Sequence, residues 1–176
     1  MGLIIKDKIQ ALLTGYPTVS DKYNVQGGIL EGTKAANFGD LLLLTDTDGA
    51  YKLPTEQFTV DQIAGILLAT NIKTPHVYPG NSALVQTYPG EALNLMLNGY
   101  VAIELDAEAT VANVKPGAKV AVMVNVASKF GKFTTADKAD TPTIVVVPGW
   151  EFTGVIENHG TNDVPVYVAE IVMKCC

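Results

Sequence analysis

Side chains that could carry out chemistry are few in this sequence. The two histidines, His76 and His159, lie far apart, and each falls in a turn-rich stretch. None of the three serines, Ser20, Ser82 and Ser128, stands in a Gly-x-Ser-x-Gly motif, which presents a serine nucleophile at a strand-to-helix turn. We therefore expect no catalytic residues and no enzymatic activity.

Metal and cofactor motifs are equally weak. The run Asp46-Thr47-Asp48-Gly49 is similar to the start of a calcium loop, and Glu56 follows at a compatible distance for a bidentate ligand. Pro54 and the flanking apolar runs favour a hairpin turn at this place instead. No His or Cys group has zinc spacing, and Gly27-Gly28 lacks the pattern of a phosphate-binding loop. The sequence predicts no metal and no cofactor.

Length and composition fit one domain with a packed core. The chain has 176 residues, of which 48% are hydrophobic and 17% charged, and a low charge content suits a protein that shares its surface with partners. It contains twelve lysines, no arginine and a net charge of −6, which disfavours nucleic acid as a partner. Apolar runs such as residues 41–44 are far shorter than the ~20 residues of a membrane-spanning helix, so no membrane partner is expected.

Apolar residues alternate along most of the chain, and this period of two predicts β-strands. Residues 93–97, 101–105 and 120–126 show the alternation, and twenty valines reinforce it because β-branched side chains suit a sheet. Further strands are expected at residues 26–31, 40–45, 63–71, 143–147, 151–157 and 164–173.

Turn signals separate these strands. Four Pro-Gly steps, at residues 79–80, 89–90, 116–117 and 148–149, each predict a type II turn, and Asp48-Gly49 predicts a hairpin. One short helical turn is expected within residues 55–63. Closely spaced short strands favour an all-β fold, a small barrel or sandwich of short antiparallel strands. We expect a single β domain over residues 25–174.

Residues 1–24 are interpreted as an N-terminal arm. Ile5, Ile9, Leu12 and Leu13 have the i, i+4 spacing of a helix that Gly15 ends, so the arm is expected to be partly helical. An apolar stripe without a core of its own docks on a partner or folds back on its own domain, and the sequence leaves both open. Residues 175–176, both cysteines, are expected to form a short reduced tail, with a bridge between subunits as the alternative.

A series of turn and strand segments has a distinctive order over residues 26–173. The segments are Gly39-Asp40-Leu41-Leu42, Ile63-Ala64-Gly65-Ile66, Tyr88-Pro89-Gly90-Glu91, Gly99-Tyr100-Val101-Ala102-Ile103, the run from Val114 to Val120, Gly131-Lys132-Phe133, and Phe152-Thr153-Gly154-Val155-Ile156-Glu157-Asn158 before the last strand. This order resembles that of the structural cement, or head decoration, proteins of tailed bacteriophages.

This resemblance implies a non-enzymatic virion protein. Such a protein is made in the host cytoplasm, binds the outer surface of the capsid, and stabilises contacts between subunits of the major capsid protein. The resemblance also implies self-association as a homotrimer. Within this hypothesis the arm residues Ile5, Ile9, Leu12 and Leu13 are the candidate contacts with the capsid or a neighbouring subunit.

Two alternatives remain open from the sequence. A different virion or surface module, such as a tail, fibre-base or carbohydrate-binding domain, would have the same strands and turns. Its sugar-stacking residues would be the aromatics at turns, Tyr78, Tyr88, Tyr100 and Trp150. An enzyme is the third hypothesis and rests only on the histidines and scattered carboxylates.

Overall fold

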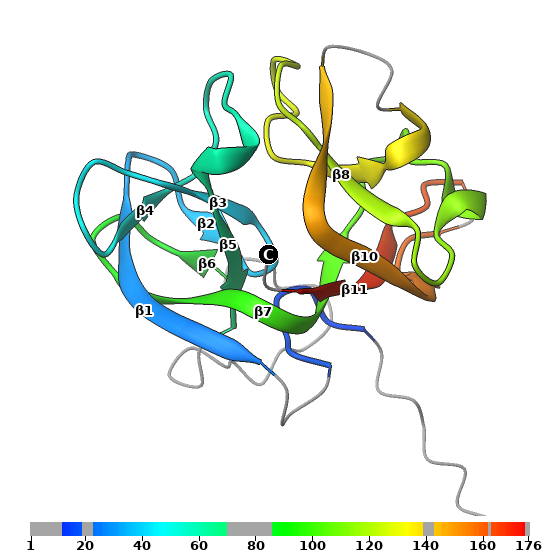
Figure 1. Cartoon of the computed structure of the whole chain (residues 1–176), viewed down its shortest axis with the longest axis horizontal. Helices are drawn as coiled ribbons and strands as arrows, with labels where there is room; N and C mark the ends of the chain where they lie inside the picture. The colour runs from blue at the N-terminus through cyan, green and yellow to red at the C-terminus, as the bar shows by residue number, and fades with distance from the viewer. Residues whose placement is uncertain (1–11, 19–22, 70–85, 139–142, 162, 175–176) are drawn as a thin grey trace, which may run out of the picture.

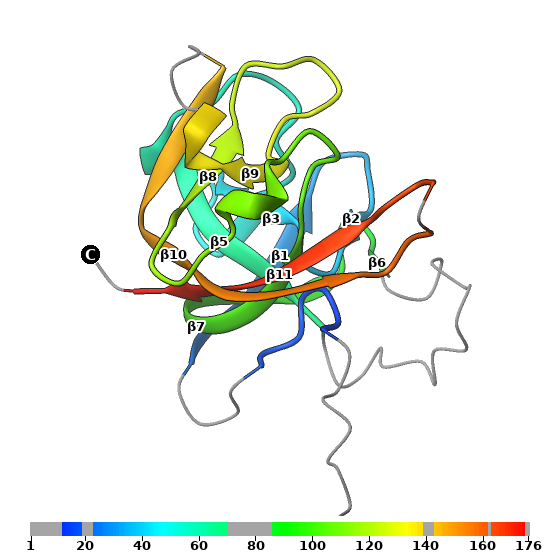
Figure 2. The same ribbon diagram turned by 90° about the vertical axis from the view of Figure 1, so that its right-hand side faces the viewer.

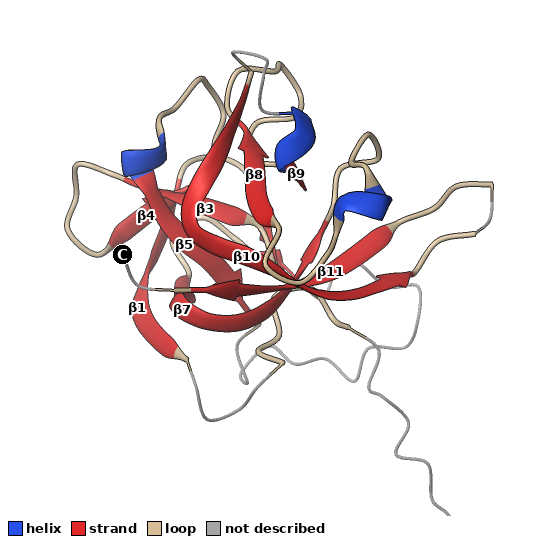
Figure 3. Ribbon diagram, turned by 45° about the vertical axis from the view of Figure 1, so that its right-hand side comes forward, coloured by secondary structure: helices blue, strands red, loops and turns tan. Residues whose placement is uncertain are grey.

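The structure, a computed structural model, describes residues 12–18, 23–69, 86–138, 143–161 and 163–174. These residues form β-strands joined by turns and short 3₁₀ segments, with no α-helix among them (Figure 3). The elements are β1 (Asn24–Glu31), β2 (Ala36–Asn37), β3 (Leu41–Leu44), β4 (Ala50–Lys52), η1 (Val60–Gln62), β5 (Ile63–Leu68), β6 (Gln86–Thr87), β7 (Ala92–Glu104), η3 (Val111–Asn113), β8 (Lys119–Met123), β9 (Phe133–Thr135), η4 (Ala136–Lys138), β10 (Ile144–Asn158) and β11 (Tyr167–Met173).

Five strands close into a mixed barrel, which occupies the left half of Figure 1. Their order is β1-β4-β3-β5-β7, and a pairing between β7 and β1 completes the circle. The β1–β4 pair is parallel, with Ile29 opposite Ala50, whereas the other four pairs are antiparallel. The expectation of an all-β barrel is confirmed.

Strand β7 belongs to the barrel and to a second group of strands beside it (Figure 1, Figure 2). Its first half pairs with β1 and β5, and its second half, from Gly99 to Glu104, pairs with β11. At the junction Gly99 has a φ of 123°, which glycine tolerates because it lacks a Cβ. The sheet continues from β11 through β10 and β8 to β9.

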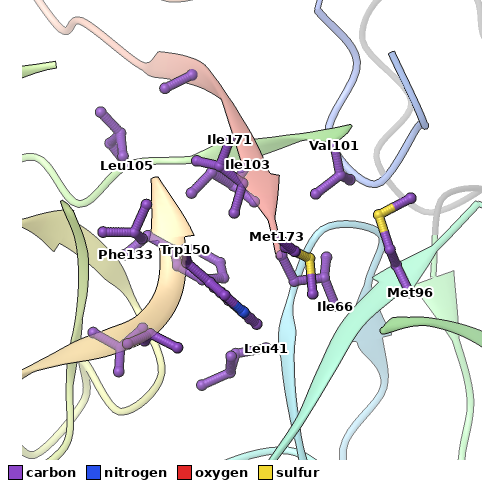
Figure 4. Packing of buried hydrophobic residues seen from close by; sticks show 14 of the residues in the cluster. Leu41, Ile66, Met96, Val101, Ile103, Leu105, Phe133, Trp150, Ile171 and Met173 are labelled. Carbon is purple, nitrogen blue, oxygen red and sulfur yellow. The ribbon is translucent and has the colours of Figure 1, made fainter. Parts of the chain in front are cut away.

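Two apolar cores follow from the alternation of side chains along these strands. Leu42 of β3 and Leu67 of β5 point into the barrel core, which also contains Leu30, Tyr51, Leu93 and Leu95. Their neighbours in sequence, such as Leu41 and Ile66, face the other way. They form an inter-sheet core with residues of β7 to β11, among them Ile103, Phe133, Trp150 and Ile171 (Figure 4).

Most of the expected turns are present in the described residues. Gly90 and Gly117 have φ values of 84° and 79°, and each turn is closed by a backbone hydrogen bond, Glu91 N–H to Tyr88 O at 3.0 Å and Ala118 N–H to Lys115 O at 2.9 Å. Asp48-Gly49 joins the antiparallel strands β3 and β4 as a hairpin. The step at residues 79–80 lies outside the described residues.

The expected turn at Pro148-Gly149 is wrong. Both residues lie inside one continuous strand, β10, where the sequence predicts two strands separated by a turn. The ladder with β8 shifts register between Val146 and Glu151, so the Pro-Gly step forms an irregularity within the strand. Proline, which cannot donate a ladder hydrogen bond, is tolerated at such a place, and Gly149 supplies the positive φ of 76°.

Two further features of the strands differ from the expectation. The sequence predicts short antiparallel strands, but β7 has 13 residues and β10 has 15. The pair β1–β4 is parallel, which a direct hairpin cannot produce. Strands β2 and β3 lie between β1 and β4 in the chain, so β4 can run in the same direction as β1. The helical turn expected in residues 55–63 is confirmed in part, as the 3₁₀ segment η1.

An ion-pair group crosses three strands at the solvent surface. Glu151 of β10 pairs with Lys119 of β8 at 2.7 Å and with Lys174, which follows β11. Hydrogen bonds from Lys119 first, and then Lys174, lower the pKa of Glu151 from 4.5 to about 2. The pairs therefore stabilise the fold above pH 4.5, and that contribution is lost as the pH falls toward 2.

The variant Glu151→Gln is expected to show a shallower loss of stability between pH 4.5 and about 2 than the wild type, because it lacks the group that takes up the proton. The difference should shrink in 1 M salt, which screens exposed charges. Chemical denaturation at a series of pH values measures it. Glu56→Gln is the control, since Glu56 pairs with Lys52 only at 3.8 Å and is 77% exposed. Equal slopes in wild type and Glu151→Gln would contradict the prediction.

Candidate functional site

Residues 12–18, here called the arm root, pack along the edge of β7. The N–H of Gly15 donates to the carbonyl of Ala102 at 2.9 Å, and the N–H of Thr18 donates to the carbonyl of Tyr100 at 3.1 Å. Pro17 forms an antiparallel bridge with Val101. The arm root thus occupies the position beside the second half of β7 that β1 occupies beside the first half.

Gly15 allows this close approach. Its φ is 73°, and a Cβ on it would lie 2.5 Å from the backbone nitrogen of Gly39. Its carbonyl accepts a hydrogen bond from Ala69 N–H at 2.9 Å, at the end of β5. The arm root therefore contacts the barrel on two sides, and only glycine fits at its centre.

The four candidate contact residues of the arm fall into three situations. Ile5 and Ile9 lie outside the described residues, as does most of the expected helix. Leu12 is 7% exposed and packs against Ala102 and Val168 of its own chain. Leu13 is 54% exposed. In the arm root the backbone forms a turn and the Pro17 bridge rather than a helix.

Glu157, near the end of β10, holds the first described residue of the arm. Its Oε2 accepts the backbone N–H of Leu12 at 2.8 Å, and Nε2 of His159 lies 3.0 Å from the same oxygen. The hydrogen bond from His159 first, and then that from Leu12, lower the pKa of Glu157. Sequence reasoning missed this contact because its partner is a backbone amide 145 residues away, which leaves no side-chain signal.

Exposed apolar side chains occur in the arm root, in β10 and in the turn that follows β10. Besides Leu13, Val155 on β10 is 43% exposed, and Val164 on the turn between β10 and β11 is 68% exposed. The turn itself is ordered by Asn158, whose Oδ1 accepts the N–H groups of Gly160 and Val166 at 2.9 and 3.2 Å. The arm root and the β10–β11 turn together present apolar groups to solvent on a fixed backbone.

The residues that could carry chemistry do not assemble into a site in the described part of the chain. His159 contacts Glu157, and His76 lies outside the described residues. Asp40 has a raised pKa because of burial, and its carboxylate accepts the N–H of Asn37 at 2.8 Å, as in a structural turn. Among the described residues, no group of three or more acidic, His or Cys side chains could hold a metal ion. No helix in the same part of the chain is long and apolar enough to span a bilayer.

The aromatic residues also fail to form a sugar-binding platform in the described residues. Trp150 is 6% exposed, and its ring lies 6.3 Å from that of Phe133, at 33° between planes. Tyr88 is 49% exposed, Tyr100 is half-buried, and Tyr78 lies outside the described residues. The hypothesis that Trp150 stacks against a sugar is therefore wrong, because its ring is buried in the inter-sheet core.

Pockets in the described residues are small. One of about 250 Å³ lies between η1 and β10 and is lined by Val60, Ile63, Ala64, Leu97, Val147, Pro148, Trp150 and Lys174. Two others, of about 110 and 150 Å³, flank Asp40 and Lys132. A drug-sized ligand fills several hundred Å³, so these hollows suit single side chains of a partner better than a small-molecule substrate.

The described residues form a mixed β-barrel and a second sheet, with the arm root paired along the edge of β7. Residues 6–169 match the sequence profile of the family described as structural cement protein (E217 gp24/Pam3 gp6). The chain belongs to this family. It is a non-enzymatic structural protein associated with the phage capsid, and the virion is its location.

The fold also matches a solved structure. A chain in the structure described as the capsid of Myoviridae phage XM1 is similar over 98% of this chain and 96% of that one, with a TM-score of 0.59. The two sequences are only 14% identical, so this likeness concerns the fold. No curated protein matched the sequence.

Proposed function

We propose that the chain binds the outer surface of the assembled capsid and stabilises contacts between neighbouring subunits of the major capsid protein. Membership of the cement family over residues 6–169 is the observation that carries this proposal. A shell loses a subunit only when all of its contacts break. A protein that spans the seam between two subunits adds contacts that must break at the same time, and this slows disassembly.

The arm supplies the contact surface in this proposal. Ile5 and Ile9 of the arm and the exposed side chain of Leu13 engage the capsid or a neighbouring copy, and Val155 and Val164 extend the apolar surface. Leu12 holds the arm root against β7 and β11. Apolar contacts with few charges are typical of the buried centre of a protein interface.

Self-association as a homotrimer is part of the same proposal. Three linked copies bind the shell at three points, and the second and third contacts form at high effective concentration. Modest affinity at each point then gives strong retention. The solution mass of the purified protein tests the oligomer number, with a single-chain mass of 18.7 kDa as the reference.

Deletion of residues 1–11 is expected to reduce retention on purified capsids by at least ~10-fold, because the loss of a few buried apolar side chains removes more than about 1.4 kcal/mol of binding free energy. Co-sedimentation with capsids that lack the protein measures retention, and the temperature at which the capsids release their DNA measures stabilisation. Cryo-electron microscopy of the same sample locates the bound copies.

A matched pair of point variants distinguishes specific binding through the arm from non-specific hydrophobic binding. Leu13→Ser and Leu44→Ser remove apolar side chains that are 54% and 50% exposed, but Leu44 lies on β3 of the barrel. Retention should fall for Leu13→Ser and stay at the wild-type level for Leu44→Ser. Density on the inner face of the shell, or normal retention of the deletion variant, would contradict the proposal.

A further inference from the structure

The contact between Glu157 and Leu12 lies where the arm joins the barrel. Leu12 is the first described residue of the arm. Two contacts hold this leucine on the sheet. Its side chain packs on Ala102 and Val168, and its N–H is bound by Glu157.

Burial of the Leu12 side chain alone does not fix the orientation of the arm-root backbone. A leucine side chain on a flat sheet face makes apolar contacts that depend little on orientation. A hydrogen bond depends steeply on angle, and one to an ionised carboxylate is about twice as strong as a neutral one. The 2.8 Å bond from Leu12 N–H to Glu157 Oε2 is the directional contact at this position.

His159 keeps the carboxylate of Glu157 in place. Its Nε2 lies 3.0 Å from the oxygen that binds Leu12, and the side chains of His159 and Glu157 are 31% and 28% exposed. The backbone of the β10–β11 ladder fixes the base of Glu157, which lies opposite Val168. The carboxylate is thus held from two directions before the arm root binds it.

We propose that Glu157, oriented by His159, is a positioning residue that anchors the arm root to the second sheet. This inference rests on the role of the arm in the proposed function, but the anchor itself exists in the free protein. Because the anchor needs an ionised carboxylate, it should loosen at acid pH.

Other charged groups share this sheet face. Glu151 lies opposite Val172, and it pairs with Lys119 and Lys174 rather than with Glu157. Glu104 of β7 is opposite Val168, and Glu170 of β11 is opposite Ala102, so both share the face of Glu157. Glu170 accepts a hydrogen bond from Thr153 Oγ1 at 2.6 Å. The arm root brings no charged side chain to this point, and His159 is the side-chain partner of Glu157 among the described contacts.

Hydrogen exchange in the free protein tests the anchor without any capsid. The amide of Leu12 is expected to lose roughly tenfold or more of its protection in Glu157→Ala, since a bond to a charged group is removed. Glu157→Gln, which keeps an acceptor but loses the charge, should lose less. Amides of β7 should keep their protection in both variants, which reports an intact fold.

The pH profile separates an anchor from a merely structural role. In the wild type, protection of the Leu12 amide relative to its intrinsic exchange rate should fall as the pH drops below the ordinary carboxyl range. The lowered pKa of Glu157 means that the bond favours the ionised carboxylate, so protonation weakens it. Glu157→Gln should show no such fall. Glu104→Gln, the same charge change two strands away, should behave as the wild type.

Unchanged protection of the Leu12 amide in Glu157→Ala would overturn the inference, whatever the capsid assay shows. An equal pH profile in wild type and Glu157→Gln would also overturn it. Failure of the arm-deleted protein to lose capsid retention would instead count against the proposed function and leave the anchor standing.

Discussion

Replacing Trp150 by alanine is expected to lower the free energy of unfolding by about 3–5 kcal/mol, the usual effect of removing a large buried aromatic side chain. Trp150 is 6% exposed in the inter-sheet core, and its ring packs on Phe133 (Figure 4). Removal of the ring opens a cavity in the inter-sheet core, where β10 packs against β5 and β7. The surrounding backbone is held in paired strands, so it cannot move in to fill the cavity. Chemical denaturation of the purified variant measures the effect.

Tyr23→Ala is the matched control for the Trp150 variant. Tyr23 is also aromatic, but it is 43% exposed and precedes β1. Its removal should change the free energy of unfolding by no more than about 0.5 kcal/mol, as for most surface substitutions. Comparable losses in the two variants would show that Trp150 contributes no more packing than a surface aromatic.

Substitution of Gly65 by alanine is expected to destabilise the protein by about 2–3 kcal/mol, at the upper end for overpacked sites. A Cβ on Gly65 would lie 2.2 Å from the backbone oxygen of Met96 and 3.0 Å from Cγ of Leu95. The nearer atom is backbone in β7, so relief requires β5 to move away from β7 and weakens the pairing that closes the barrel. Thermal and chemical denaturation measure the loss.

Gly27→Ala makes the same chemical change without the contact. Gly27 lies in β1, and a Cβ on it would meet nothing within 4 Å. Alanine also restricts the unfolded chain more than glycine does, so this variant should be neutral or slightly stabilised. If the two variants were equally destabilised, the steric explanation for Gly65 would be wrong.

The all-β fold and its turns could be predicted because they depend on local signals. Alternating apolar residues mark β7 and β8, and a short apolar run marks β3, whatever the rest of the chain does. The turns at Gly90 and Gly117 need only a proline and a glycine in sequence. The order of these signals, rather than any one of them, indicated the cement family that the sequence profile then confirmed.

The Pro148-Gly149 step shows where local signals are insufficient. Its residues are the same types as those at Gly90 and Gly117, and Gly149 has the same sign of φ. Pairing with β8 before the step and with β11 after it keeps the strand continuous, and both partners are distant in sequence. The parallel β1–β4 pair depends in the same way on contacts that no local pattern encodes.

The candidate site was predicted only in outline. An apolar arm is visible in the sequence because Ile5, Ile9, Leu12 and Leu13 are spaced on one side of a short segment. The burial of Leu12 and the exposure of Leu13 are set by Val168 and Ala102, which meet only after β7 and β11 pair. In the sequence Glu157 looks like an ordinary surface acid, because its hydrogen-bond partner is a backbone amide 145 residues away.

The sharing of β7 between the barrel and the second sheet has a consequence for how the chain folds during synthesis. The five barrel strands are complete once residue 104 has left the ribosome, so the barrel half has all of its own partners early. The second half of β7 waits for β11, which ends at residue 173. Pairings between residues so distant in sequence form slowly. During that interval one edge of β7 is open to pairing with other nascent chains, and we expect aggregation in rapid overexpression to be relieved by slower translation.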